Sequence, residues 1–283
     1  MQTMLQKKKP NRSFNIANIP SFLEPPGCRS EGFNHPSRNG TVIKLALFQE
    51  HRFAFYYWLK WTQKLNGVIP SLITFDWHQD LCPPYKDQIP ELKKLRIDDP
   101  VEVALYTWGK LSHDNDVQIH AALKHNMLKD IYVICRQDAN RKPIDTLKDF
   151  KGSIHKIHIF KSVDDFVKYL PSISDEQVYL DIDLDYFTLS NPLSMSNPFP
   201  EKHFTFMKKK EIVDMLSVDN PMIEWIFKRL AGITIATEPE FCGGLKQSNY
   251  FLNIIDELYF TPSLFHNIPG SSNGYTKWRH INF

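Results

Sequence analysis

The sequence contains few of the features that mark a secreted, membrane-bound or nucleic-acid-binding protein. Its four cysteines form no CxxC pair, which argues against a zinc knuckle or a thioredoxin-type motif. No stretch approaches the roughly 18–20 apolar residues of a transmembrane helix, and the basic N-terminus lacks the apolar run of a secretory signal. The formal net charge is only +2, which gives no sign of a nucleic-acid partner. We therefore expect a reduced, cytoplasmic protein with neither a membrane nor a nucleic-acid partner.

The composition is that of a packed globule. Of the 283 residues, 42% are hydrophobic, 13% aromatic and 23% charged, which argues against disorder. Residues 1–40 are rich in Pro, Asn, Ser and Lys and are expected to form an irregular arm. Residues 41–283 show no internal repeat and no linker, so we expect them to form one domain, with the oligomeric state left open.

Segments typical of strands and helices alternate through this domain. Strands are expected at 41–48, within 68–78, and at 130–136, 153–160, 177–182 and 232–237. Helices are expected at 51–65, 101–111, 115–127, 163–170, 209–217, 220–230 and 245–260, and a long proline-bearing loop at 81–95. Such alternation predicts βαβ units and a mainly parallel sheet, that is, an α/β three-layer sandwich.

Three of the predicted strands end in acidic or histidine residues. In an extended segment, side chains i, i+2 and i+4 point to one side, so each motif presents its acids together. Ligands of open parallel sheets bind at the carboxyl ends of the strands. We therefore expect these side chains to meet in one small volume. In chain order they are His51, then Asp76, His78 and Asp80, then Asp181, Asp183 and Asp185.

So many carboxylates at close range would repel one another without cations. Divalent metal ions are the usual compensation, and this number of ligands suits two ions rather than one. Oxygen ligands with imidazole and without thiolate favour Mn²⁺, with Fe²⁺, Co²⁺ or Zn²⁺ possible. Two ions could activate a water for attack on a planar carbon. Either motif alone could be a solvated strand end or an acidic turn, but both together, with a histidine after an earlier strand, favour a metal site.

At these positions the sequence resembles arginases, agmatinases and related ureohydrolases over about residues 42–245. These enzymes carry a histidine after an early strand, then D-x-H-x-D, then a strand ending in D-x-D, then a late acid. The nearest match is a divergent branch that includes peptide arginases of ribosomal natural-product pathways. The segments that carry the resemblance are EHRFAFYYW, FDWHQDL, YLDIDLD and TIATEPE.

The resemblance implies an arginase/deacetylase-like fold and a division of ligands between two ions. A late glutamate would pair with the guanidinium of the substrate, and both Glu238 and Glu240 fit that position. By this resemblance, one ion takes His51 and Asp80, the other takes His78 and Asp183, and the bridges are Asp76 and Asp181. The candidate catalytic residues are Asp80, Glu238, Glu240 and His113.

Two departures from the arginase pattern bear on the substrate and on proton transfer. Arginases follow D-x-H-x-D with a polar loop that grips the free amino acid, whereas this chain has LCPPYKDQIPELKK. That loop also carries a histidine proton shuttle, but no histidine occurs here between His78 and His113. His113 could replace it or could be a surface residue.

The expected function is therefore a binuclear metal-dependent hydrolase of a guanidinium group. It would convert arginine residues in a partner peptide to ornithine and release urea. The alternatives are a small-molecule ureohydrolase, a deacetylase-like amidohydrolase, and a non-catalytic metal-binding relative. The exact substrate and the native metal stay open.

Overall fold

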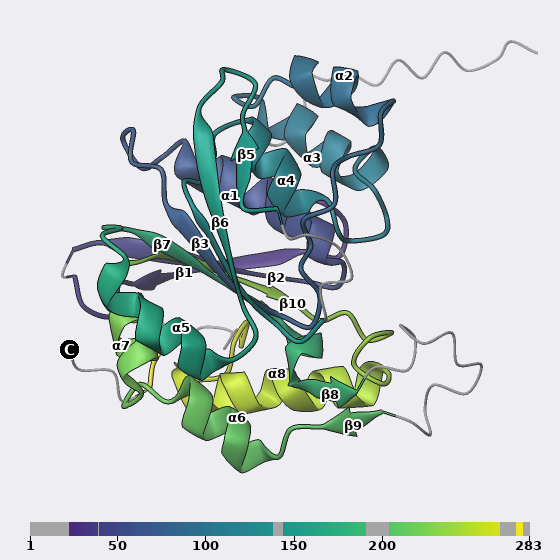
Figure 1. Ribbon diagram of the computed structural model, residues 1–283. Helices are drawn as coiled ribbons and strands as arrows, with labels where there is room; N and C mark the ends of the chain where they lie inside the picture. Colours follow the sequence, from purple (N-terminus) through teal and green to yellow (C-terminus); the bar gives the residue numbers. More distant parts are fainter. Residues whose placement is uncertain (1–22, 39, 138–143, 191–203, 267–275, 280–283) are drawn as a thin grey trace, which may run out of the picture.

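The computed structural model describes residues 23–38, 40–137, 144–190, 204–266 and 276–279 of the chain. Its centre is an eight-stranded sheet with the order β1-β2-β10-β7-β3-β4-β6-β5 (Figure 1). Neighbouring strands are parallel, except that the edge strands β1 and β5 run antiparallel to β2 and β6. The strands are β1 (Arg29–Asn34), β2 (Val42–Phe48), β3 (Ser71–Asp76), β4 (Ile131–Cys135), β5 (Thr146–Lys148), β6 (Ile154–Phe160), β7 (Val178–Asp183) and β10 (Leu230–Ala236).

The inner strands β3 and β7 are buried along their whole length because helices cover both faces of the sheet. All six residues of β3 are buried, and so are all six of β7. Alternate side chains of β3 enter different hydrophobic clusters: Ile73 and Phe75 lie on one face, and Leu72 lies on the other. In Figure 1, α1 to α4 lie above the sheet and α5 to α8 lie below it. The predicted three-layer α/β sandwich is confirmed.

The helices occur close to where the sequence predicts them. The expected helix at 51–65 forms as a 3-10 turn (His51–Phe53) followed by α1. None of the described helices is long and apolar enough to cross a membrane. The helices are α1 (Ala54–Thr62), α2 (Gln88–Lys94), α3 (Pro100–Gly109), α4 (Gln118–Lys124), α5 (Val163–Tyr169), α6 (Lys209–Leu216), α7 (Pro221–Lys228) and α8 (Leu245–Tyr259). Two small sheets pair β8 (Thr188–Ser190) with β9 (Thr205–Phe206) and β11 (Phe260–Thr261) with β12 (Lys277–Trp278).

The segment 81–95 is not the uninterrupted loop that its prolines suggest, because α2 (Gln88–Lys94) forms within it. Pro90 is the third residue of this helix. The first backbone N–H groups of a helix have no intrahelical partner, so the missing N–H of a proline costs little there. A proline at this position therefore permits a helix to start and does not by itself indicate a loop.

The segment expected as an irregular arm also contains regular structure. Residues 1–22 of that arm lie outside the described residues, but β1 pairs with β2 along its whole length, from Arg29 opposite Leu47 to Asn34 opposite Val42. Only Phe33 of β1 is buried. An edge strand with one buried side chain lacks the apolar alternation by which strands are identified in a sequence. The sheet therefore begins earlier in the chain than residue 41.

Candidate metal centre

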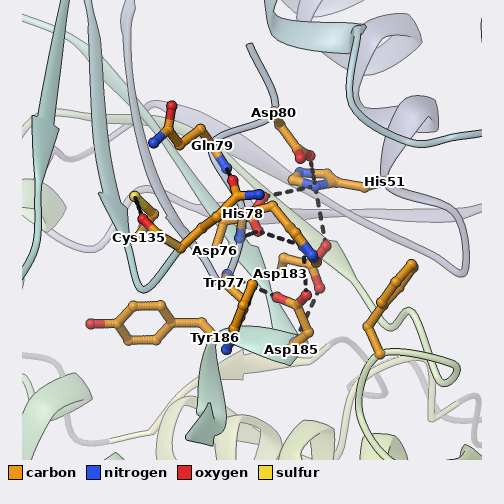
Figure 2. Close-up of polar contacts among 12 residues, drawn as sticks. His51, Asp76, Trp77, His78, Gln79, Asp80, Cys135, Asp183, Asp185 and Tyr186 are labelled. Carbon is orange, nitrogen blue, oxygen red and sulfur yellow. Dashed lines mark hydrogen bonds and ion pairs between the residues drawn. The ribbon is translucent and has the colours of Figure 1, made fainter. Parts of the chain in front are cut away.

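A buried cluster of histidine and acidic side chains lies at the carboxyl ends of four adjacent strands. These strands follow one another in the sheet as β2, β10, β7 and β3. His51 comes three residues after β2, Glu238 comes two residues after β10, and Asp183 and Asp76 are the last residues of β7 and β3. Figure 2 shows His51, Asp76 and Asp183 pointing toward one another. The cluster thus occupies the edge at which open parallel sheets bind ligands.

The imidazole of His51 faces three carboxylates with a single nitrogen. Its Nδ1 lies 2.9 Å from Asp80 Oδ2, 3.1 Å from Asp183 Oδ2 and 3.3 Å from Asp76 Oδ2. The side chain of His51 is completely buried. One nitrogen can donate at most one proton, so it cannot hydrogen-bond to all three oxygens. The arrangement is that of several ligand atoms converging on one point.

The imidazole of His78 forms a second group with Asp76 and Asp185. Its Nδ1 lies 3.1 Å from Asp185 Oδ2 and 3.7 Å from Asp76 Oδ1 (Figure 2). Asp76 therefore faces His51 with one carboxylate oxygen and His78 with the other. One ligand atom from each of His51, Asp76 and Asp80 lies within 4.8 Å of the others, and the same holds for Asp76, His78 and Asp185. Two neighbouring groups that share a carboxylate could hold one or two metal ions.

Unpartnered atoms in the cluster fit a cation. His51 Nδ1, Asp76 Oδ2 and Asp185 Oδ2 are buried and have no aligned hydrogen-bond partner. Buried polar atoms without partners are costly, and each such atom requires an explanation. A divalent ion bound to these atoms would satisfy them and neutralise the carboxylates. Imidazole and carboxylate donors without thiolate suit Mn²⁺, Fe²⁺, Co²⁺ or Zn²⁺.

The protonation equilibria of the cluster reflect its excess of negative charge. Burial, with the nearby Asp185, raises the pKa of Asp183 to about 7. Burial and the neighbouring Asp80 raise the pKa of Asp76 well above its usual range. Burial opposes protonation of His78, but the adjacent carboxylate of Asp185 outweighs this and raises the pKa to about 10. Protons therefore compensate the cluster when no metal is bound, and a metal must displace them.

In the groups that could hold a metal ion, the motif DIDLD contributes Asp183 and Asp185 rather than the expected Asp181 and Asp183. Asp181, predicted to bridge two ions, lies one step inside the sheet, opposite Thr74 of β3 and Thr234 of β10. Among the described residues it belongs to none of the groups that could hold a metal, whereas Asp185 belongs to the His78 group. Residues two apart in a strand point to the same face, so the alternation of side chains cannot tell Asp181 and Asp183 from Asp183 and Asp185 as the ligand pair.

The two candidate glutamates have different surroundings. Glu238 is buried, and its Oε1 accepts a hydrogen bond of 3.0 Å from the backbone N–H of His51. It also forms a third possible metal group with His51 and Asp183. Glu240 is exposed. Of the two, the structure brings only Glu238 into the cluster.

His113 lies outside the cluster. Its side chain is 73% exposed, and its Nδ1 lies 3.7 Å from Glu50 Oε2. Glu50 is also bound by the buried guanidinium of Arg52, at 2.6 Å. The structure therefore supports the surface alternative for His113 rather than a position beside the ligands.

Two residues of the cluster adopt backbone conformations that L-residues rarely adopt. Asp80 has a φ of 50° and Glu238 a φ of 25°. Asp80 is held from the other side by Gln118, a fully buried residue of α4 whose Nε2 donates to Asp80 Oδ2. Strained conformations persist only where the surroundings fix them, and they concentrate at functional sites. The sequence contains a weak signal for Gln118, since it is polar in a predicted helix that packs on the sheet.

A scan of the chain against models of known protein families found no match, and a search among curated proteins found none. The sequence motifs and this buried cluster are therefore the features that bear on the function of the chain.

Proposed function

We propose that this protein is a binuclear metal-dependent hydrolase that converts arginine residues in a peptide to ornithine and releases urea. The observation that supports the proposal most strongly is the pair of ligand groups that share the buried Asp76, next to the buried carboxylate of Glu238. In the reaction, water adds to the guanidinium carbon and the bond from this carbon to the side-chain nitrogen breaks. The products are an alkylammonium and urea, so charge and atoms balance.

Two sets of residues would hold the ions. When bound there, divalent ions would polarise the substrate carbon and make a water nucleophilic near neutral pH. Mn²⁺ is the metal we propose, because the donors are carboxylates and imidazoles. One set is His51, Asp76, Asp80 and Asp183, and the other is Asp76, His78 and Asp185.

Glu238 is the residue proposed to bind the substrate cation. Its carboxylate is oriented by the backbone N–H of His51, which donates to Oε1. A guanidinium would form charge-assisted hydrogen bonds with this carboxylate, which are stronger than neutral ones. This contact would hold the reacting carbon beside the two ligand groups.

The choice of a peptide rests on the segment that follows Asp80. Arginases have small polar residues there, but this chain has LCPPYKDQIPELKK. Tyr85 of this segment is exposed and its hydroxyl donates to Asp114 (2.6 Å). A free arginine would bring an ammonium and a carboxylate, and leaving such charges unpaired is costly. A peptide brings neutral amides in their place, which favours arginine within a chain as the substrate.

The test is steady-state urea release by the Mn²⁺-loaded protein from two substrates at equal concentration. One is a peptide with blocked termini and a single arginine, and the other is free L-arginine. We expect faster urea release from the peptide and, by mass spectrometry, loss of one CN₂H₂ unit from it. The same peptide with lysine in place of arginine is the control.

The other outcomes separate the alternatives. Faster release from free arginine would make the protein a small-molecule ureohydrolase. Deacetylation of an acetyl-lysine peptide, without urea release, would make it a deacetylase-like amidohydrolase. Metal binding with no reaction on any of these substrates would leave a non-catalytic metal-binding protein.

A further inference from the structure

We infer that Asp181 is a positioning residue: it orients His51 and fixes the ring tautomer in which Nδ1 can bind a metal. The inference rests on the metal site of the proposed function, but not on the guanidinium substrate. The carboxylate of Asp181 is fully buried, and its Oδ2 lies 2.8 Å from Nε2 of His51. The ring of His51 thus stands between Asp181 on one side and the ligand carboxylates on the other.

A chain of hydrogen bonds supplies two hydroxyl donors to the carboxylate of Asp181. The indole Nε1 of Trp58 can only donate, and it donates to Thr234 Oγ1 at 3.2 Å. The Thr234 hydroxyl therefore keeps its own proton for Asp181 Oδ1, at 2.5 Å. Thr74 Oγ1 donates to the other oxygen, Oδ2, at 2.8 Å. Both oxygens accept from hydroxyls, which favours the carboxylate form, and in that form Oδ2 accepts from Nε2 of His51.

The tautomer of His51 follows from this network. An ionised carboxylate only accepts, so Nε2 of His51 must carry the proton of the bond to Asp181. In the neutral ring, Nδ1 then has a lone pair, and it is this atom that faces Asp76, Asp80 and Asp183. Partners of this kind orient histidine ligands and raise their basicity. Nδ1 is thus the ring atom that a metal ion can bind once the ion displaces any proton held there among the carboxylates.

The sheet itself holds Asp181 in place. Asp181 is in register with Thr74 on one neighbouring strand and with Thr234 on the other. Its two oxygens are therefore bound from both sides by hydroxyls of the same rung of the sheet. Trp58 of α1 adds to this network, because its fully buried indole packs against the sheet and donates to Thr234. A shift of strand register would break all of these contacts together, so the position of His51 is tied to the pairing of three strands.

The test is calorimetric titration of the metal-free protein with Mn²⁺. We expect Asp181→Ala to weaken the binding of one ion roughly 10- to 100-fold, and to leave the ion bound by His78 nearly unchanged. Asp181→Asn keeps the shape and an acceptor oxygen, so it should lose less. Asp175→Asn is the matched control, because Asp175 is also buried and accepts from Ser71, Tyr132 and Lys129. It lies at the other end of β3 and should leave both ions bound as in the wild type.

A double-mutant cycle with His51→Ala separates positioning from general damage. If Asp181 acts through His51, Asp181→Ala should have no further effect on metal affinity once His51 is removed. Multiplicative losses in the two variants would overturn the inference, as would wild-type affinity in Asp181→Ala. If Asp181→Ala does not fold, the same cycle is run with Asp181→Asn. A wild type that binds no divalent ion also overturns it, whereas one that binds Mn²⁺ without releasing urea overturns only the proposed function.

Discussion

Carboxylates are buried at both ends of β3, but their surroundings differ. At the amino end, Asp175 accepts from Ser71 Oγ (2.8 Å) and Tyr132 OH (2.9 Å) and pairs with the ammonium of Lys129. Burial works against its ionisation, yet these hydrogen bonds hold its pKa below the usual range. At the carboxyl end, the ion pairs of the cluster that the structure describes involve only histidines. There the pKa of Asp183 is raised to about 7.

The comparison distinguishes structural from functional burial of charge. Asp175 pairs with the ammonium of Lys129 and accepts from two hydroxyls, so its charge is compensated within the protein. The cluster around Asp76 has orphaned oxygens and a surplus of acids, which a packed core would not retain without compensation. Because the ion pairs described for the cluster involve only histidines, we expect a divalent metal ion from solution to supply the compensating positive charge.

The largest effect should come from Asp183→Ala or His78→Ala. Each variant removes a ligand, so urea release should fall to the level of the metal-free protein and Mn²⁺ content should drop. The fold should persist, since loss of Asp183 also relieves repulsion among the acids. Metal analysis, an activity assay and circular dichroism check this. A variant with full activity and full metal content would contradict the assignment.

The matched pair Glu238→Gln and Glu240→Gln tests the substrate carboxylate. A hydrogen bond to a charged group contributes about 1.5–3 kcal/mol, so Glu238→Gln should lower kcat/KM for the peptide by roughly 10- to 100-fold. Glutamine keeps an acceptor for the His51 N–H, so metal content should stay near that of the wild type. The exposed Glu240 should tolerate its substitution. The opposite ranking of the two variants would move the cation contact to Glu240.

The stability of the metal-free protein should depend on pH with the sign set by the raised pKa of Asp183. The folded state holds a proton there up to about pH 7, whereas the unfolded state releases it at lower pH. The free energy of unfolding should therefore fall as pH rises from about 4 to 7. Asp183→Asn should flatten this slope. Mn²⁺ at a hundredfold excess over its Kd should add about 2.7 kcal/mol per site above pH 7.

The smallest change in function should come from Asp175→Asn. Its pKa is lowered in the folded state, so its contribution to stability is present at neutral pH and is lost as pH falls below its usual range. The variant should lose about 1–3 kcal/mol of unfolding free energy at pH 7. Urea release and Mn²⁺ affinity should be unchanged. A loss of metal affinity here would show that the two ends of the sheet are coupled, and would weaken the contrast between them.

Much of the fold could be predicted because its signals are strong. The apolar runs of β3 and β7 are buried on both faces, and the helices between the strands have clear periodicity. The edge strand β1 has one buried side chain and gave no such signal. The helix α2 was missed because Pro90 indicates a loop unless its position in the first turn is known.

The sequence located the site, but it did not determine which acids of each motif enter the cluster. His51, Asp76, His78, Asp80 and Asp183 lie together, as the motifs predict. The role of Asp181 depends on the register of β7 against its neighbours, which a period of two does not reveal. The choice between Glu238 and Glu240 depends on which side chain the turn after β10 buries, and Glu238 is the buried one. The exposure of His113 likewise depends on the conformation of a loop.

The most direct test of the two-ion centre is anomalous diffraction at the manganese edge from crystals grown with Mn²⁺. We expect two peaks that share Asp76: one bounded by His51, Asp80 and Asp183, and the other by His78 and Asp185. No peak at this edge of the sheet, or a peak bound directly by Asp181, would contradict the account.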